Sequence, residues 1–343
     1  MRKVLLATTA LVALGGVSAA SADVSLSASA SWVYDSWSDD TTATTSTNNS
    51  STESDADFTI SGSTTADSGM TFGGSIAFDD TTDGDDSNMF ISDDWGRIDM
   101  GEANDAAKSA SAGNSATDAG ISGSTKVTTA DGSVSAGLGT DTIVGGENAN
   151  GLKYTSPTVN GLTLAVSQFD AGAASRADGT QMGLTYAIDV DGIAITAHYA
   201  TAKTDSAADV ATGTTSYETD QSGFGVKIVY GDFTVRAASR DTDYKQQGST
   251  IGSTGYEAST SDYGITYAMS DTLTLEAHTG SGELSASSAN ASDTLETTQV
   301  GVKYVPATGL YVSLTNRSYE FKDVSAGSTN DGANTRLKVG VTF

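Results

Sequence analysis

Polar and apolar residues alternate strictly over residues 24–32, within the first long stretch after the N-terminal segment, residues 23–37. Large side chains such as Val24, Trp32 and Tyr34 occupy even-numbered positions, whereas serines occupy the odd-numbered positions from Ser25 to Ser31. Successive side chains of an extended chain point to opposite faces, so this period of two indicates a β-strand. We therefore predict a strand here that separates an apolar environment from a wet one.

The same alternation recurs along the chain and predicts sixteen strands. They span residues 23–37, 55–66, 69–80, 88–94, 96–103, 149–157, 161–170, 179–189, 192–203, 219–230, 232–243, 257–269, 272–280, 295–305, 310–321 and 333–343. Short turns alternate with longer polar loops, of which 38–54 is the first, so all the longer loops leave from one rim. An even number of strands with loops sorted in this way is typical of outer-membrane barrels. We predict an all-β fold, a sixteen-stranded antiparallel transmembrane β-barrel over residues 23–343.

One segment, residues 104–148, does not follow the alternation. Its 45 residues are mainly Ala, Ser, Thr, Gly, Asp and Asn, with few large apolar side chains. Such a long connection inside a compact domain is uncommon unless it has a function of its own. We predict that this third long loop folds into the lumen and narrows it, although a surface loop is the simpler alternative. A further hairpin at 124–139 would raise the count to eighteen strands, but it offers few apolar residues, and we keep sixteen.

Basic residues fall on the strand face opposite the apolar one. Nine of the fifteen Lys and Arg residues after residue 22 do so. They are Arg97, Lys153, Lys227, Arg236, Arg240, Lys303, Arg317, Arg336 and Lys338. An Arg or Lys facing lipid near the bilayer midplane costs about 2–4 kcal/mol, so a spanning strand must turn it inward. The pattern therefore predicts a lumen wall rich in positive charge.

Acidic residues are distributed differently, because most lie in loops or at strand ends. Asp57, Asp99 and Glu276 are the clearest acids at inward strand positions. Since few acids neighbour the nine basic residues on the strands, we expect acids of the long loop to balance them across a narrow gap. Our candidates for the acidic side are Glu102, Asp105 and Asp118, and Arg97, Arg236 and Arg240 are the best candidates for the basic side.

The first 22 residues have the character of a secretory signal peptide. Two basic residues, Arg2 and Lys3, precede an apolar run that ends in Ala20-Ser21-Ala22, a small-residue cleavage site. Removing this segment, which contains no acid, changes the formal net charge from −26 to −28. A chain this acidic is not a general nucleic-acid binder, and without cysteine it has neither disulfides nor thiol chemistry. A hydrophobic fraction of 37% is low for a globular chain but suits a barrel with a wet interior.

Motifs for catalysis are sparse, so we predict no enzymatic activity and no cofactor. The two histidines, His198 and His278, lie on separate strands at inward positions, and a Ser-His hydrolase barrel is the enzymatic alternative. The acidic run at residues 79–88 offers oxygen ligands suited to calcium, with Asp83, Asp85 and Asp86 as candidates. It departs from EF-hand spacing, and a solvated charge run is the preferred interpretation.

Four features of the chain point to one family: the stretch FISDDWGRIDMGEANDA at residues 90–106, the long third loop, the signal peptide and the terminal Phe343. In these features the chain resembles general diffusion porins of Gram-negative bacteria, closest to the alphaproteobacterial (Rhodobacter) type. The resemblance covers residues 23–343. It implies a homotrimer in the outer membrane, a loop that enters the lumen, and acids on that loop that face basic residues on the wall.

On this basis we expect passive diffusion of small hydrophilic solutes and ions, with a modest preference for cations. Outer-membrane lipid and lipopolysaccharide are the expected partners. Two alternatives stay open: a substrate-specific outer-membrane channel, which would need more inward aromatic residues than Phe169, Tyr311 and Tyr319, and a secreted acidic, calcium-binding surface protein or adhesin.

Overall fold

The structure is a computed structural model, and over the residues that it describes all but one of the regular elements are β-strands. It describes residues 23–41, 47–79, 86–102, 106–109, 144, 150–169, 177–206, 216–247, 256–286, 292–324 and 327–343. The predicted signal peptide, residues 1–22, lies outside the described residues and stays a prediction. Strand β1 begins at Asp23, the residue after the predicted cleavage site. No helix among the described residues is long and apolar enough to cross a membrane.

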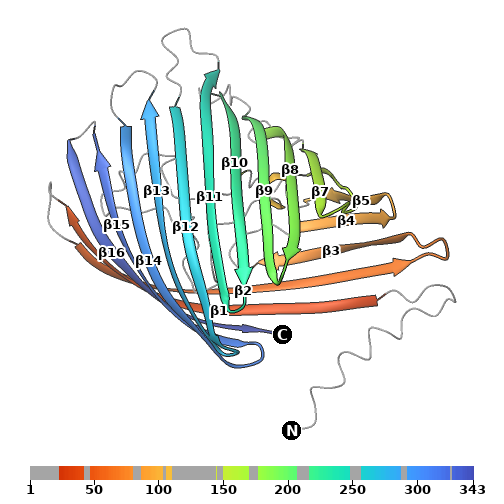
Figure 1. The fold of residues 1–343 in the computed structure, drawn as a ribbon, viewed down its shortest axis with the longest axis horizontal. Coiled ribbons are helices and arrows are strands. Elements are labelled where there is room, and N and C mark those ends of the chain that lie inside the picture. Colours follow the sequence, from red (N-terminus) through yellow and green to blue (C-terminus); the bar gives the residue numbers. More distant parts are fainter. Residues whose placement is uncertain are drawn as a thin grey trace.

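Sixteen antiparallel strands form one closed barrel, as the alternation predicted (Figure 1). Each strand pairs with its neighbours in sequence, and β1 pairs with β16 to close the ring. The strands are β1 (Asp23–Thr41), β2 (Thr47–Thr65), β3 (Thr71–Asp79), β4 (Asp86–Asp93), β5 (Gly96–Gly101), β6 (Gly151–Thr155), β7 (Leu162–Phe169), β8 (Ala177–Val190), β9 (Ile193–Ser206), β10 (Ser216–Tyr230), β11 (Phe233–Gln247), β12 (Tyr256–Ser270), β13 (Leu273–Ala286), β14 (Ser292–Ala307), β15 (Leu310–Asp323) and β16 (Ser328–Thr342). A short helix, α1 (Ala106–Ser109), follows β5. In Figure 1 the strands β1–β3 cross behind β9–β12, because tilted strands on opposite walls of a barrel cross in projection.

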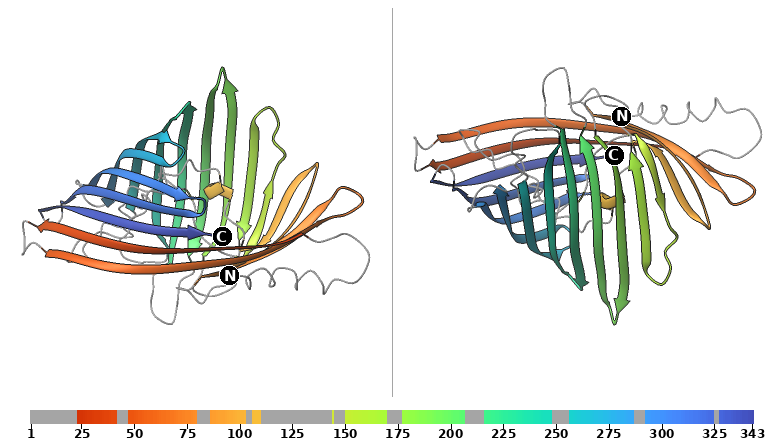
Figure 2. Two further views of the ribbon diagram at one scale, coloured as in Figure 1. Left: turned by 90° about the horizontal axis from the view of Figure 1, so that it is seen from below. Right: turned by 90° about the horizontal axis from the view of Figure 1, so that it is seen from above.

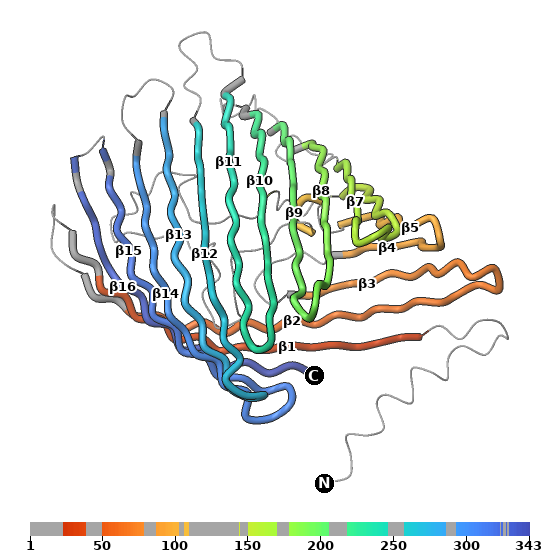
Figure 3. The backbone as a smooth tube through the Cα atoms, viewed as in Figure 1, coloured from red at the N-terminus to blue at the C-terminus, as the bar shows by residue number. Residues whose placement is uncertain are grey.

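Tight turns join the strands at one rim (Figure 3). Strands β8 and β9 are connected by Asp191 and Gly192 alone, with φ of 53° and 80°. Asn160 and Gly161 before β7 have φ of 50° and 84°. Positive φ at both central residues is the geometry of a type I′ turn, whose twist matches that of the strands, and Asn, Asp and Gly adopt it most readily. These residue pairs therefore fix the register of the hairpins that they close.

Register places the apolar and the charged side chains on opposite faces of the wall. One row across the strands β14, β15, β16 and β1 is Val302, Leu314, Leu337 and Tyr34. The adjacent row is Gly301, Thr315, Arg336 and Asp35. Leu314 is among the exposed large apolar residues, as a lipid-facing side chain of an isolated barrel must be. The outer face is therefore the lipid face, and the polar row lines the lumen.

The barrel wall is low on one side. Strands β3, β4, β5, β6 and β7 have 9, 8, 6, 5 and 8 residues, whereas all other strands have 14 to 19. The sequence predicted short fourth and fifth strands, and the structure extends the low side to β7. The connection that carries α1 leaves from this side, between β5 and β6.

The prediction of a loop at residues 38–54 was wrong. Strand β1 continues to Thr41 and β2 begins at Thr47, and these two ends pair with each other as far as Asp39 and Thr47. Beyond the lipid, water solvates the outer face of the wall, so both faces of a strand can be polar and the alternation disappears while the backbone ladder continues. Strands β9, β11, β13 and β16 extend past their predicted ends for the same reason. The alternative hairpin at 124–139 lies outside the described residues.

Candidate functional site: the inner wall and the docking of the third loop

The start of the third loop is attached to the inner wall by hydrogen bonds. The backbone N–H of Ala106 donates to Ser167 Oγ on β7 at 3.2 Å, and that of Ala107 donates to Gln181 Oε1 on β8 at 3.1 Å. N–H groups in the first turn of a helix have no partner within the helix, so these two barrel side chains take the place of a cap. Ala106 and Ala107 are 0% exposed, and Figure 2 shows α1 against β8 and β9.

The far end of the loop docks on the same part of the wall. Val144 is 1% exposed and packs in one apolar cluster with Ala107, Ala200 and Ala202. Gly223 on β10 leaves the space that the Val144 side chain occupies, because a Cβ at this position would meet Val144 Cγ2 at 2.5 Å. Small inward residues on β9 and β10 thus form a shallow seat for both ends of the loop. Residues 110–143, which include Asp118, lie outside the described residues.

All nine predicted basic residues occupy inward positions of the wall. Their register partners place them on the lumen row of each strand. Lys227 on β10 lies directly across from Arg236 on β11, and Arg240 pairs with Gly223 in the same hairpin. Like charges opposite each other on a sheet repel. This hairpin therefore concentrates positive charge beside the seat of the loop.

Near the root of the loop, the wall supplies its own counter-charge. Arg97 Nη2 lies 2.6 Å from Asp99 Oδ1, and Lys153 Nζ lies 3.7 Å from Asp99 Oδ2. The guanidinium of Arg97 also stacks over Phe90, with 3.8 Å between its Cζ and the ring centroid. Asp99 was predicted to face inward, but its pairing with Arg97 and Lys153 was not predicted. Glu102 Oε2 accepts a hydrogen bond from the backbone N–H of Ser87 at 3.3 Å, which ties it to the start of β4.

A second wall acid, Asp35, was not predicted from the sequence. Its two carboxylate oxygens accept bidentate hydrogen bonds from Arg336 Nε and Nη2, each at 2.8 Å. Asp35 lies within β1 directly after Tyr34. Its odd-numbered position, on the face away from Trp32 and Tyr34, was the signal that would have found it. The expectation that few acids neighbour the basic residues was therefore wrong for this wall.

The third polar group centres on His278, which faces the lumen as predicted. His278 Nδ1 lies 3.0 Å from Asp262 Oδ2, and both side chains are buried. Next to them Gln299 Nε2 donates to Glu276 Oε1 at 2.8 Å. Asp262 is a further inward acid that was not predicted. His198, the other histidine, has its Nδ1 3.4 Å from Thr185 Oγ1.

Several inward aromatic rings lie over glycines on the adjacent strand. A Cβ on Gly332 would meet the ring of Tyr319, and a Cβ on Gly340 would meet that of Tyr311. Phe169 covers Gly179 in the same manner. These are the three aromatic residues that the sequence placed inward, and each ring fills the space left by a missing side chain. The rings therefore protrude less into the lumen than their size suggests.

The calcium prediction is not tested. Asp83 and Asp85 lie outside the described residues, as does Asp105, and the side chain of Asp86 is not described. Over the described ranges, no group of three or more Asp, Glu or His side chains is arranged to hold a metal ion.

The geometry defines a class of protein: a sixteen-stranded outer-membrane barrel with a wet, charged interior. The family model for Gram-negative porins matches residues 7–323, and the chain belongs to this family. It is accordingly a porin of the outer membrane, a member of a family of channel proteins. Among curated proteins, none matches the sequence significantly.

Solved structures with the same fold are distant in sequence. OmpT of Vibrio cholerae is 10% identical with a TM-score of 0.67, and the alignment covers 95% of this chain and 99% of that one. OmpF of Salmonella typhi, solved with daunomycin, is 16% identical with a TM-score of 0.64 over 93% and 97% of the two chains. The anion-selective porin of Comamonas acidovorans is 12% identical with a TM-score of 0.62 over 94% and 100%.

The seat of the loop generates the first prediction. Replacing Gly223 by Val should displace Val144, which loses about 1.5–3 kcal/mol of burial, and should loosen the loop end. Hydrogen exchange of the Ala106 and Ala107 amides should then accelerate at least tenfold in the purified barrel. Adding Val144→Ala to Gly223→Val should restore part of the protection. Unchanged exchange in the single variant would mean that Val144 does not hold the loop.

Proposed function

We propose that the protein is a passive channel for small hydrophilic solutes and ions, without catalysis, energy coupling or a cofactor. The closed barrel of sixteen strands with a charged, polar inner wall carries this proposal. A barrel of this size leaves an aqueous path, whereas eight-stranded barrels are filled by their own side chains.

Liposome swelling tests the proposal. Vesicles that contain the protein should swell in isotonic solutions of small sugars and should not swell in large dextrans, because the lumen excludes the polymer. Vesicles prepared with heat-unfolded protein are the control. Equal swelling rates in both solutes would contradict a size-limited channel.

We further propose that the third loop narrows the lumen and completes a charged constriction. Both described ends of the loop dock on inward residues of β7–β10, which supports this path. The positive hairpin of Lys227, Arg236 and Arg240 lies beside that seat. Acids of the loop region, with Glu102, Asp105 and Asp118 as candidates, would then face these basic residues across the gap.

A modest preference for cations follows from the net charge of −28 on residues 23–343. Screening limits the reach of exposed charge to about 8 Å at physiological ionic strength, so the preference should be stronger in dilute salt. The inward basic residues oppose this preference, and the balance between wall and loop sets its size.

Replacing Arg236 and Arg240 together by Ser should therefore increase the cation preference. We expect the reversal potential in a tenfold KCl gradient to move toward the potassium limit by several millivolts or more. The matched control replaces Lys203 and Lys322 by Ser, since it removes the same charge from the outer face. A larger shift in this control would place the selective charges outside the lumen.

We propose that the low side of the barrel forms the interface of a homotrimer. The outer face of β2–β5 has a groove of about 540 Å³ lined by Ile60, Ile76, Met89 and Met100. Met89 is 59% exposed in the single chain. One similar structure, an in-vitro folded OmpT of Vibrio cholerae, is described as a trimer form.

Replacing Ile76 and Met89 by Gln should convert the trimer into monomers, because polar groups at a buried interface remain unsatisfied. Light scattering in mild detergent measures the mass. The control replaces Leu275 and Val300 by Gln, two outward residues on the opposite side, and should leave the trimer intact. A monomeric native protein would contradict the proposal outright.

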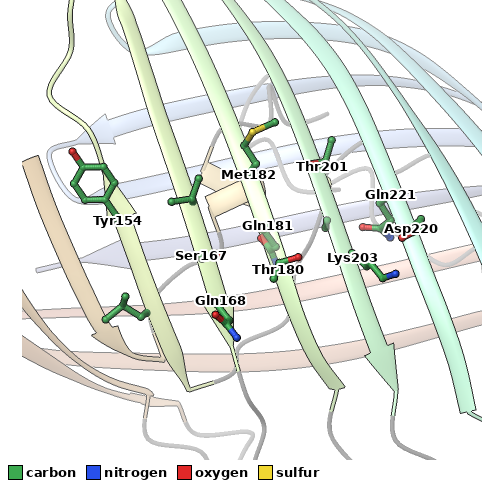
Figure 4. A pocket seen from close by; sticks show the side chains of 13 residues that line it. Tyr154, Ser167, Gln168, Thr180, Gln181, Met182, Thr201, Lys203, Asp220 and Gln221 are labelled. Atoms are coloured by element: carbon green, nitrogen blue, oxygen red, sulfur yellow. The ribbon is translucent and has the colours of Figure 1, made fainter.

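We propose that outer-membrane lipid, including lipopolysaccharide, occupies a second outer groove. This groove of about 690 Å³ on β6–β10 has an apolar floor that includes Leu152, Val166 and Met182 (Figure 4). Lys203 lies at its end towards the longer loops, where Lys203 Nζ is 2.8 Å from Glu218 Oε1. Acyl chains fit the floor, and an anionic headgroup fits the ammonium.

Replacing Lys203 by Glu should reduce the lipopolysaccharide that copurifies with the barrel by at least half. Lys322→Glu is the matched control, because Lys322 is also exposed, points outward and pairs with an acid. The amount is measured by phosphate analysis of the extracted lipid. Equal amounts in both variants would show that the groove does not select the headgroup.

A further inference from the structure

Arg317 is a buried cation on the lumen side of β15. It lies between Gln299 on β14 and Asn334 on β16, on the inward row of all three strands. Only 2% of its surface is exposed, and it is the largest of the fully buried side chains in the described part of the barrel. Burying a guanidinium is costly unless its charge and its hydrogen bonds are matched.

The guanidinium of Arg317 is not matched by hydrogen bonds. Within the described ranges, its Nε, Nη1 and Nη2 have no hydrogen-bond partner. Asp262 and Glu276 are close enough to act on Arg317 electrostatically. Their carboxylates, however, are engaged by other groups: Asp262 by His278 Nδ1 and Glu276 by Gln299 Nε2.

A second positive charge adjoins Arg317. Arg336 acts on it as a like charge, and Asp35 holds Arg336 through both carboxylate oxygens. Asp35 also accepts from Asn334 Nδ2 at 3.4 Å, so this acid is already shared by two donors. Asp262 and Glu276, the two acids that act on Arg317, and Asp35, which holds Arg336, are therefore all engaged by other groups, and the donors of Arg317 remain available for an acceptor.

We propose that Arg317 is the centre of an oxyanion-binding subsite on the β14–β16 wall, which holds the carboxylate or phosphate group of a solute in the channel. An arginine fork matches both groups by paired N–H···O bonds, and the buried position favours a compact group. The inference rests on the proposed channel function, because the lumen is the route to the subsite. An anion held there is retained rather than passed on, which is compatible with a net preference for cations.

Single-channel recording with inorganic phosphate and with acetate tests the subsite. In KCl, millimolar phosphate should reduce the conductance of the native channel in a saturable manner, and acetate should do the same at higher concentration. Charged hydrogen bonds contribute about 1.5–3 kcal/mol, so Arg317→Gln should raise the half-blocking concentration at least tenfold. Arg317→Lys keeps the charge but loses the paired N–H donors, and it should raise the half-blocking concentration several-fold. This variant tests the subsite if the Gln variant fails to fold.

Lys153→Gln is the matched control, since it removes one inward charge from β6, on another part of the wall and outside the positive hairpin of β10 and β11. It should shift the half-blocking concentration less than twofold. Equal shifts in Lys153→Gln and Arg317→Gln would overturn the subsite, because the block would then reflect net charge alone. An effect of both anions on the native channel that does not saturate would also overturn the subsite. In that case, swelling of the same vesicles in small sugars would show that the proposed channel function still holds.

Discussion

The pairing of β1 with β16 is the contact on which the rest of the barrel depends. Hydrocarbon offers no hydrogen-bond partner to a peptide group, so a sheet that spans a membrane must have no open edge. Here the last residue takes part in the closure, since Phe343 N donates to Ala28 O at 2.8 Å. The paired residues of β1 and β16 lie 289 to 313 positions apart in the chain, and the outer edges of these two strands stay open until they meet. Closure removes this last open edge and fixes the register between the two ends of the chain, on which the contact of Asp35 with Arg336 depends.

The sequence could predict the sixteen strands because lipid enforces the alternation. Val302, Leu314 and Leu337 share a row on the outer face, and each was recognisable from its own strand alone. Where the strands rise above the lipid, that constraint ends. Residues 38–54 showed no alternation for this reason, although most of them continue β1 and β2. Strands are therefore best predicted from the sequence in the part of the barrel that faces lipid.

The charges of the inner wall were predictable by face but not by partner. Arg336 was placed inward by its own strand, whereas its pairing with Asp35 depends on the register between the two ends of the chain. Arg97 and Asp99 lie on one strand, two positions apart, and their contact depends on side-chain orientation rather than on pattern. The seat under Val144 was invisible for another reason, because a single glycine on β10 carries no signal of the distant residue that fills its space.

The attachment of the third loop at both of its ends has a consequence for how this barrel tolerates change. The hydrogen bonds of α1 and the packing of Val144 attach both ends of the loop, its two anchors, to residues of the wall. Sequence inserted between the anchors starts and finishes at fixed points on the wall, whatever its composition. Substitutions and insertions between the two anchors, whether natural or engineered, therefore leave the attachment points and the barrel fold in place.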